Sequence, residues 1–499
     1  MKRVAMIDDT FLRLENRRQP LHIGMLMLLD PPKDAGKDFA KNIAERLREC
    51  TDFAPPFNQR LVRRAGLDYW AEDKDLDLDQ HFVHLSLPAP GRIRELLAMV
   101  SRVHSNHLDR AFPLWRLYLI EGIEDGRIAM YLKIHHSLTD GISGIQMLKS
   151  SMSTDQEASK TMPAPWAIGI KKPKNAQPLP VPTPADSISA LRTMAQQGFS
   201  SGLNSIKAVG REIYKSFKDY REHNPDFALG GQAPRSIFNH KVSSSRRFAA
   251  QSYSTPRIRA VARANGATSN DVILAMCSGA LRYYLEDRHE LPKEPLLAAI
   301  PVSVRREDHP TDAANEVAFT MTHLATNIDD PIERLKAIKS CMDYNKERIH
   351  NLSPGELTTY AAMMLLPGVT NSILGYAPNK ALGSAVISHV PGPREDVYWQ
   401  GAKLSGLYPV SLVVDSVALN ITIISRHDFV DFGIIACRKT VPSMQKMLKY
   451  LQVALEDMEK AMGIEIPDSE EEKATQAKPD DAEKAIEKVT GEARSVAVS

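Results

Sequence analysis

The sequence has little that could cross-link the chain or hold it within a membrane. Four of its 499 residues are cysteines, and their spacing forms none of the pairs that bind zinc or close a small disulfide framework. No run of about 20 uncharged apolar residues occurs, the length needed to cross a bilayer, and the first residues lack the apolar core of a secretory signal. We therefore expect a cytoplasmic protein with reduced cysteines, no metal site and no transmembrane segment.

Two functional classes also lack their signatures. The chain has no Gly-x-Ser-x-Gly turn and no cysteine in a papain-like context, so nothing indicates a covalent nucleophile. The net charge is +2, and no basic stripe carries the interleaved aromatic residues that nucleic-acid binding requires. These absences argue against a covalent enzyme intermediate and against nucleic acid as a partner.

A strand that ends in two histidines is the most informative local feature. Apolar side chains alternate along residues 127–134, which predicts a half-buried strand. Extending the alternation places His136 on the apolar side and His135 on the other. Because an imidazole has a reference pKa of ~6.5, His136 is suited to act as a general base that takes a proton from a hydroxyl. Alternatively, it only hydrogen-bonds within a core; a metal shared by both histidines and Asp140 is disfavoured, since neighbouring strand residues point to opposite faces.

The run His-His-x-x-x-Asp-Gly, residues 135–141, resembles the signature of CoA-dependent acyltransferases. Further segments, in this order along residues 1–465, are similar to the bacterial wax ester synthase/diacylglycerol acyltransferase family. The sequence departs from that family at Arg116, where an acidic residue is frequent, and at His389, where Asn is usual. The matching segments are Asp8-Asp9-Thr10-Phe11-Leu12 with Glu15, Pro20-Leu21-His22-Ile23-Gly24, Pro113-Leu114-Trp115, Ser269-Asn270-Asp271, Pro301-Val302-Ser303-Val304-Arg305 and Val390-Pro391-Gly392-Pro393.

The resemblance implies an α/β fold (α+β, with mixed sheets) of two chloramphenicol-acetyltransferase-like domains with an active-site channel between them. It implies transfer of a long-chain acyl group from acyl-CoA to a fatty alcohol or to diacylglycerol, giving wax ester or triacylglycerol. Acyl-CoA is then a substrate, and no cofactor is needed. Since nothing indicates a nucleophile, direct transfer is favoured. Two alternatives stay open: a condensation-type acyltransferase with another donor or acceptor, and a non-catalytic protein that binds a lipid surface.

Several residues of the matching segments are candidates for the site. The resemblance implies a structural, orienting role for Asp140. Gly141 is expected because the turn needs a residue without Cβ, which leaves room for substrate. Asn270 and Ser303 are candidates for stabilising the oxyanion or facing the channel, as are backbone amides after Gly141.

Two further candidates have competing structural explanations. Asp271 lies beside Asn270, but its spacing from Thr268 also predicts a capping box at a helix start. The segment Pro113-Leu114-Trp115 is expected to form part of the substrate channel, although an aromatic residue there could equally pack in a core.

The composition predicts two domains joined by a proline-rich crossover, because 499 residues are too many for one ordinary core. We expect an N-terminal domain at 1–152, a crossover with an amphipathic helix at 153–234, and a C-terminal domain at 235–466. Residues 467–499 contain nine acidic and five basic residues with few large apolar side chains. Such a segment is predicted to be disordered.

Periodicity predicts the main elements of both domains. Hairpins are expected from 115–121 with 127–134 and from 419–425 with 429–437, further strands at 297–305 and 384–390, and helices after Gly141 and at 268–288 and 445–462.

A basic amphipathic stretch at 187–221 is the candidate for contact with lipid. Apolar residues recur there at spacings of three to five, with Lys207, Arg211 and Lys215 among the polar positions. The stretch either packs onto a domain or lies on a lipid surface. Because fatty acceptors are nearly insoluble, we expect peripheral association with the inner membrane or with lipid droplets.

Overall fold

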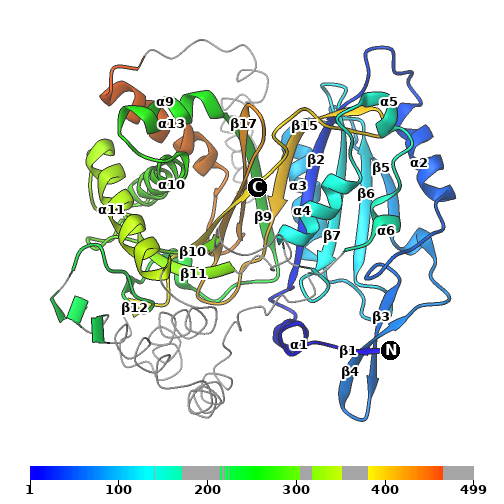
Figure 1. Cartoon of the computed structure of the whole chain (residues 1–499), viewed down its shortest axis with the longest axis horizontal. Helices are drawn as coiled ribbons and strands as arrows, with labels where there is room; N and C mark the ends of the chain where they lie inside the picture. Colours follow the sequence, from blue (N-terminus) through cyan, green and yellow to red (C-terminus); the bar gives the residue numbers. More distant parts are fainter. Residues whose placement is uncertain are drawn as a thin grey trace, which may run out of the picture.

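Two large sheets stand side by side in the protein, one built mainly by the first part of the chain and one by the second (Figure 1). The computed structural model describes residues 1–139, 141–170, 214–215, 218–219, 221–222, 224–303, 317–350 and 380–464. The helix predicted at 187–220 lies almost wholly outside the described residues, and the charged tail 467–499 lies entirely outside them.

The first sheet has six strands in the order β14-β15-β2-β7-β6-β5. The predicted hairpin of β6 and β7 is confirmed, and its strands pair antiparallel. However, every residue of β7 is buried, so the prediction of a half-buried strand is wrong. One face of β7 packs in the core of the first half and the other face packs toward the second half. The strands are Tyr398–Trp399 (β14), Ala402–Val410 (β15), His22–Asp30 (β2), Ile128–His135 (β7), Trp115–Glu121 (β6) and Phe82–Ser86 (β5).

Two predicted domain boundaries do not follow the sheets. Strands β14 and β15 come from the expected C-terminal domain 235–466, yet they belong to the first sheet, where β15 pairs antiparallel with β2. The expected crossover from 153 also begins too early. Two short helices there, Gln156–Ser159 (α5) and Pro165–Ile168 (α6), pack on the first half, and Trp166 is fully buried in its core.

The second sheet has six strands in the order β11-β10-β13-β16-β17-β9. It is mixed, because β13 runs parallel to both of its neighbours, and the predicted hairpin of β16 and β17 is confirmed. Helices cover its outer face (Figure 1). The strands are Val317–His323 (β11), Leu297–Ser303 (β10), Ala385–Pro391 (β13), Leu419–Ser425 (β16), Phe429–Cys437 (β17) and Arg246–Ser254 (β9); the helices are Thr255–Ala264 (α9), Ser269–Glu286 (α10), Pro331–His350 (α11) and Lys446–Ala461 (α13).

One large hydrophobic cluster is built from both halves. Helix α3, Ile93–Ser105, is packed against β9 of the second sheet, and the Ser101 hydroxyl accepts a hydrogen bond of 2.9 Å from the Phe248 amide. Tyr131 of β7 and Phe432 of β17 belong to the same buried cluster. Apolar surface buried between the halves therefore holds them together, as it does inside one domain.

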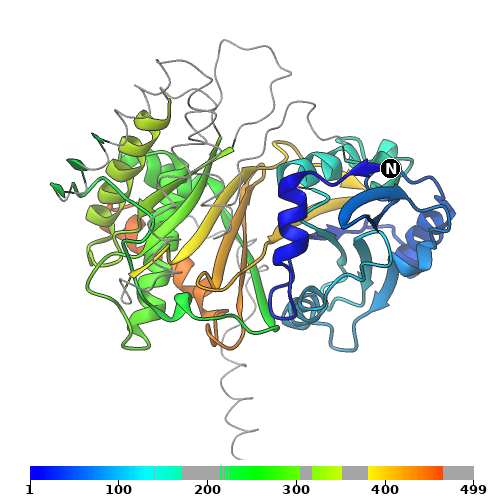
Figure 2. The same cartoon turned by 90° about the horizontal axis from the view of Figure 1, so that it is seen from below.

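The chain begins in a small third sheet and a helix that adjoins both halves. Strands Lys2–Arg3 (β1), Leu67–Glu72 (β4) and Gln59–Arg64 (β3) form a three-stranded sheet in the order β1-β4-β3. Helix α1, Met6–Leu14, follows β1 directly and lies at the border between the two halves in the view of Figure 2. Two further helices of the first half are Phe39–Glu49 (α2) and Gly141–Ser150 (α4). Among the helices in the described ranges, none is both long and apolar enough to cross a membrane.

Candidate active site

The two histidines lie at a turn that joins β7 to α4. The His135 amide donates to the Leu114 carbonyl at 2.9 Å, and the His136 amide donates to the Leu21 carbonyl at 3.0 Å. The backbone of this turn is therefore fixed on both sides by neighbouring segments of the first sheet. Asp140, the acidic residue of the motif, lies outside the described residues.

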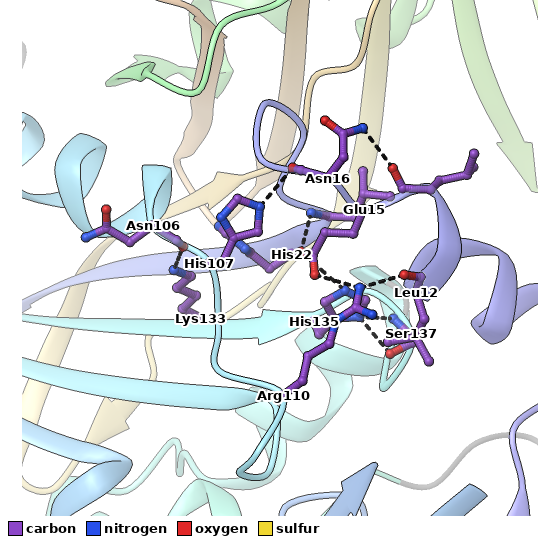
Figure 3. A network of polar contacts seen from close by, with 12 residues as sticks. Leu12, Glu15, Asn16, His22, Asn106, His107, Arg110, Lys133, His135 and Ser137 are labelled. Carbon is purple, nitrogen blue, oxygen red and sulfur yellow. Dashed lines mark hydrogen bonds and ion pairs between the residues drawn. The ribbon is translucent and has the colours of Figure 1, made fainter. Parts of the chain in front are cut away.

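His135 is fully enclosed, its Nδ1 is hydrogen-bonded to Ser137, and its Nε2 faces the Glu15 carboxylate without a hydrogen bond. Its side chain is 1% exposed. Nδ1 accepts a hydrogen bond of 3.1 Å from the Ser137 amide and lies 2.7 Å from the Ser137 hydroxyl. The proton of the neutral ring is therefore on Nε2, which faces Glu15 Oε1 at 3.6 Å (Figure 3). This geometry encloses His135 and places it against Ser137 and Glu15.

Glu15 connects the end of α1 to the histidine turn. Its carboxylate accepts hydrogen bonds from the Leu21 amide at 3.1 Å and from the Arg110 guanidinium at 3.0 Å. Burial alone would raise the pKa of Glu15, but His135, the Leu21 amide and Arg110 together lower it to about 2. The carboxylate is thus charged at neutral pH and holds α1 over the turn.

His136 is half-buried, and its ring stacks on Phe11 of α1. The ring centroids are 4.3 Å apart and the planes differ by 16°. His136 is half-buried whereas His135 is buried, so the expectation that the alternation carries His136 to the apolar side of the strand is not met. The strand ends at His135, so the alternation that a strand imposes does not extend to the next residue. His136 is the more accessible of the two imidazoles.

Three buried basic side chains lie behind the turn. The Lys133 ammonium donates to the carbonyls of Val103, at 2.9 Å, and Asn106, at the end of α3 (Figure 3). His22 Nε2 lies 2.5 Å from the His104 carbonyl. Burial, reinforced by the charge of a nearby arginine, lowers the pKa of Lys133 to about 7. Burial likewise lowers the pKa values of His22 and His104 well below 6.5.

Gly141 begins α4 beside open space. A Cβ placed on Gly141 would have no heavy atom within 4 Å other than its chain neighbours. The described protein atoms therefore leave room for a side chain at this position, so no steric clash supports the expectation that the turn needs a residue without Cβ, and a role of the space in holding substrate stays a prediction.

The expectation that Pro113-Leu114-Trp115 lines a substrate channel is not supported. Leu114 and Trp115 are fully buried in the core of the first half, and Pro113 is also buried. The Trp115 indole donates to the Phe57 carbonyl at 2.8 Å and stacks on His81 with centroids 4.5 Å apart. The indole N–H is therefore hydrogen-bonded, and the ring is packed inside the core. Trp115 stabilises the sheet rather than contacting an acyl chain.

Asn270 belongs to a second polar cluster, in the other half of the protein. His389 Nδ1 lies 3.2 Å from Asn270 Oδ1, and His389 Nε2 lies 2.6 Å from the Ser425 hydroxyl. An amide oxygen only accepts, so Nδ1 donates and Nε2 accepts from Ser425. Burial lowers the pKa of His389 to about 4, which keeps the ring neutral. The arrangement leaves the amide nitrogen of Asn270 able to donate elsewhere.

Asp271 has a structural role, and the predicted capping box is confirmed. Its carboxylate accepts from the Thr268 amide at 2.9 Å and from the Thr268 hydroxyl at 2.7 Å, while its own amide donates to that hydroxyl at 3.2 Å. Asp271 was a candidate for the oxyanion site or the channel, but a carboxylate that accepts these hydrogen bonds has no proton to donate to an oxyanion, and its contacts explain it as a helix cap. Ser303 is the last residue of β10, and its side chain lies outside the described part.

We expect the melting temperature to fall as the pH is lowered from about 6.5 toward 4, and His389 to contribute to this fall. The folded pKa of His389 is about 4, whereas an unfolded histidine titrates near ~6.5. Between these values the unfolded chain binds a proton that the folded protein does not, so stability increases with pH across this window and is lost as the pH falls. Thermal melts of wild type and His389→Asn are measured across this pH range. The melting temperature should change less with pH in the variant than in the wild type. Parallel curves would contradict the prediction.

Sequence reasoning missed the residues that organise the turn. Glu15 and Phe11 lie in a segment that matches the family, but neither pattern nor spacing indicates a role for them or for Arg110. An acidic residue between Arg13 and Arg17 was the one available signal for Glu15. Its contacts with Arg110 and His135 join residues far apart in the chain, which local periodicity does not report.

A cavity of about 580 Å³ lies at the opposite end of β7, between the β6–β7 turn and the start of α2. It is lined by Asp30, Phe39 and Arg127 among others, and the length of the strand separates it from the histidines by roughly 20 Å. Within the described ranges, no three His, Cys, Asp or Glu side chains gather in a way that could hold a metal ion.

Two family models match the chain. The wax ester synthase/diacylglycerol acyltransferase catalytic domain matches residues 4–273, and the C-terminal domain of the same family matches residues 313–459. The catalytic match includes the histidine turn, Glu15 and Asn270, whereas His389 lies in the C-terminal match.

Individual proteins extend this similarity over nearly the whole chain. An O-acyltransferase WSD of Acinetobacter baylyi is 42% identical over 454 residues, which cover 91% of this chain and 96% of the relative. The solved structure of a wax ester synthase/diacylglycerol acyltransferase from Marinobacter aquaeolei VT8 is 39% identical, with a TM-score of 0.75, and covers 93% of this chain and 100% of its own. The first condensation domain of the CDA synthetase shares the fold, with a TM-score of 0.53. It is 12% identical, and the match covers 92% of this chain and 96% of that domain.

Proposed function

Because the chain belongs to the wax ester synthase/diacylglycerol acyltransferase family and is an O-acyltransferase, we propose that it moves a long-chain acyl group from acyl-CoA to the hydroxyl of a fatty alcohol or diacylglycerol, with His136 as general base. The observation that carries the assignment is the difference between the two histidines. The His135 side chain is 1% exposed and hydrogen-bonded through Nδ1 to Ser137, whereas His136 is half-buried at the end of the turn.

The proposed reaction needs one base and no covalent enzyme intermediate. His136 takes the proton of the acceptor hydroxyl while the hydroxyl oxygen attacks the carbonyl carbon of the thioester. The tetrahedral intermediate then collapses, the carbon–sulfur bond breaks, and the CoA sulfur receives the proton from the imidazolium. A thiol is a good leaving group, with a reference pKa of ~8.5, so the main demands on the protein are activation of the hydroxyl and stabilisation of the oxyanion.

Two sets of groups support this chemistry in our proposal. His135, Glu15 and Ser137 orient the turn so that His136 is held at a fixed position, and Asp140 has a structural role in the same turn. Asn270 is our first candidate for a donor to the oxyanion, because His389 occupies its amide oxygen and leaves its amide nitrogen for another partner. The Ser303 hydroxyl and backbone amides after Gly141 are further candidates.

We also propose that the enzyme works in the cytoplasm at a lipid surface, as a peripheral protein of the inner membrane or of lipid droplets. Acceptors with long chains are nearly insoluble in water, so they must be collected where they are dissolved in lipid. Acyl-CoA, with its charged head group, reaches the same site from the aqueous side.

A thiol-release assay tests the proposal and ranks the acceptors. Purified protein is given a long-chain acyl-CoA together with hexadecanol or with a diacylglycerol, and free CoA thiol is measured in parallel. We expect release that depends on the acceptor and appears with at least one of the two. Release that requires neither acceptor would indicate hydrolysis, and no release with either would refute the proposal in favour of a non-catalytic lipid-binding role or another acceptor class.

A further inference from the structure

The small sheet at the start of the chain has two faces of different character. In the register of β1, β4 and β3, Arg3 pairs with Tyr69, and Tyr69 pairs with Val62. Paired residues of antiparallel strands point to the same side, and alternate residues along a strand share a face. One face therefore carries Arg3, Arg60, Val62, Arg64, Leu67, Tyr69 and Ala71, which we call the arginine face.

The opposite face of this sheet is occupied by the protein itself. Val4, Leu61 and Trp70 project from it into the core of the first half. None of Val62, Leu67 and Tyr69 on the arginine face belongs to a buried cluster of the described residues. Leu67 is 37% exposed, one of the few large apolar side chains in the described part that are so open to water. The arginine face thus keeps apolar and aromatic side chains at the surface.

Charge is also divided between the faces. The acidic residues within the strands are Asp68 and Glu72. They alternate along β4 with the residues of the arginine face and so lie on the opposite side of the sheet. There the Asp68 carboxylate is 3.8 Å from the Arg63 guanidinium. On the arginine face, Arg60 contacts Asp73 just beyond β4 at 3.8 Å, and no ion pair forms between Arg3 or Arg64 and another residue in the described ranges. The face is positive, with apolar side chains between the charges.

We propose that the arginine face binds the surface of an anionic phospholipid bilayer. Arginine side chains reach phosphate groups while their stems cover apolar surface, and tyrosine is favoured at the boundary between head groups and acyl chains. Attraction between anionic lipid and each basic residue near the surface adds to the area buried by Val62 and Leu67. The inference rests on the proposed function, since an enzyme with lipid-dissolved acceptors needs this contact.

The position of the sheet relates this surface to the active site. Strand β1 leads directly into α1, and Phe11 of α1 stacks on His136. The three strands and α1 lie together along one edge of the first half (Figure 1). A bilayer bound to the arginine face would therefore hold α1 and the histidine turn close to the lipid that supplies the acceptor.

Vesicle flotation tests the surface with full-length protein. Vesicles of phosphatidylcholine alone are compared with vesicles of phosphatidylcholine mixed with phosphatidylglycerol. We expect binding to the mixed vesicles, weakened by salt, and a loss of at least ~30-fold in Arg60→Glu/Arg64→Glu, from the attraction of two basic residues. Arg60→Lys/Arg64→Lys should retain binding, because it keeps the charge. Arg259→Glu/Arg263→Glu, two exposed arginines on α9, is the control with the same change in net charge and should bind as wild type does.

Leu67→Asp provides a second test if the double reversal lowers the melting temperature. It should weaken binding to the mixed vesicles without removing a basic residue. Wild-type binding in the double reversal, equal losses in the α9 control, or no preference for the mixed vesicles would each overturn the inference. Thiol release by the wild type with hexadecanol or a diacylglycerol is measured separately. Its absence would count against the proposed function, whereas its presence with no vesicle binding would count against the arginine face alone.

Discussion

His136→Ala should reduce thiol release by ~10² to 10⁴-fold, the usual contribution of a general base, while leaving the melting temperature close to that of the wild type. The ring is half-buried at the end of the turn, and its removal leaves the backbone hydrogen bond to Leu21 in place. The measurement is acyl-CoA turnover with a saturating acceptor, alongside a thermal melt of the same preparation.

His135→Ala is the matched comparison. It removes a ring that is 1% exposed and takes away one of the partners of the buried Glu15 carboxylate, so we expect a loss of ~1–3 kcal/mol in the free energy of unfolding. Turnover should fall less than in His136→Ala. A His136→Ala enzyme that keeps most of its turnover, or a His135→Ala protein that is catalytically worse yet fully stable, would reverse the roles assigned to the two histidines.

Asp431→Ala should lower the free energy of unfolding by ~3–5 kcal/mol, because it leaves a buried cation without its partner. Asp431 is fully buried on β17, where it accepts from the Leu407 amide of β15 at 2.8 Å and pairs with Arg426 at 2.5 Å. The Ser252 hydroxyl on β9 donates to it at 2.6 Å. One carboxylate thus joins the first sheet to the second. Urea unfolding of wild type and variant measures the loss in the free energy of unfolding.

Asp428→Ala is the control for this prediction. Asp428 lies three residues away, pairs with His427 and is 62% exposed, so its removal should change the free energy of unfolding by less than ~0.5 kcal/mol. Asp431→Asn keeps the size and the acceptor oxygen but removes the charge, and an intermediate value is expected. Similar stabilities of Asp431→Ala and Asp428→Ala would show that apolar burial alone holds the sheets together.

Part of the site could be located from sequence because it depends on neighbours in the chain. The capping box at the start of α10 follows from residues three positions apart, and the histidine turn follows from a strand pattern that stops before Asp-Gly. The cluster of Asn270, His389 and Ser425 could not be found in this way. Its three residues come from α10, β13 and β16, and only the folding of the second half brings them within hydrogen-bonding distance.

The sequence by itself determined where several of the elements lie and which family they build. The hairpin strands at 115–121, 419–425 and 429–437 coincide with the prediction, since alternation of side chains and turn residues are local properties. The tertiary structure decided which residues those elements meet. Strand β15 joins the first sheet beside β2 although most of its neighbours in sequence belong to the second. Both faces of β7 are covered, His135 is enclosed and His136 is the more exposed of the two imidazoles, because burial depends on contacts between segments far apart in the chain.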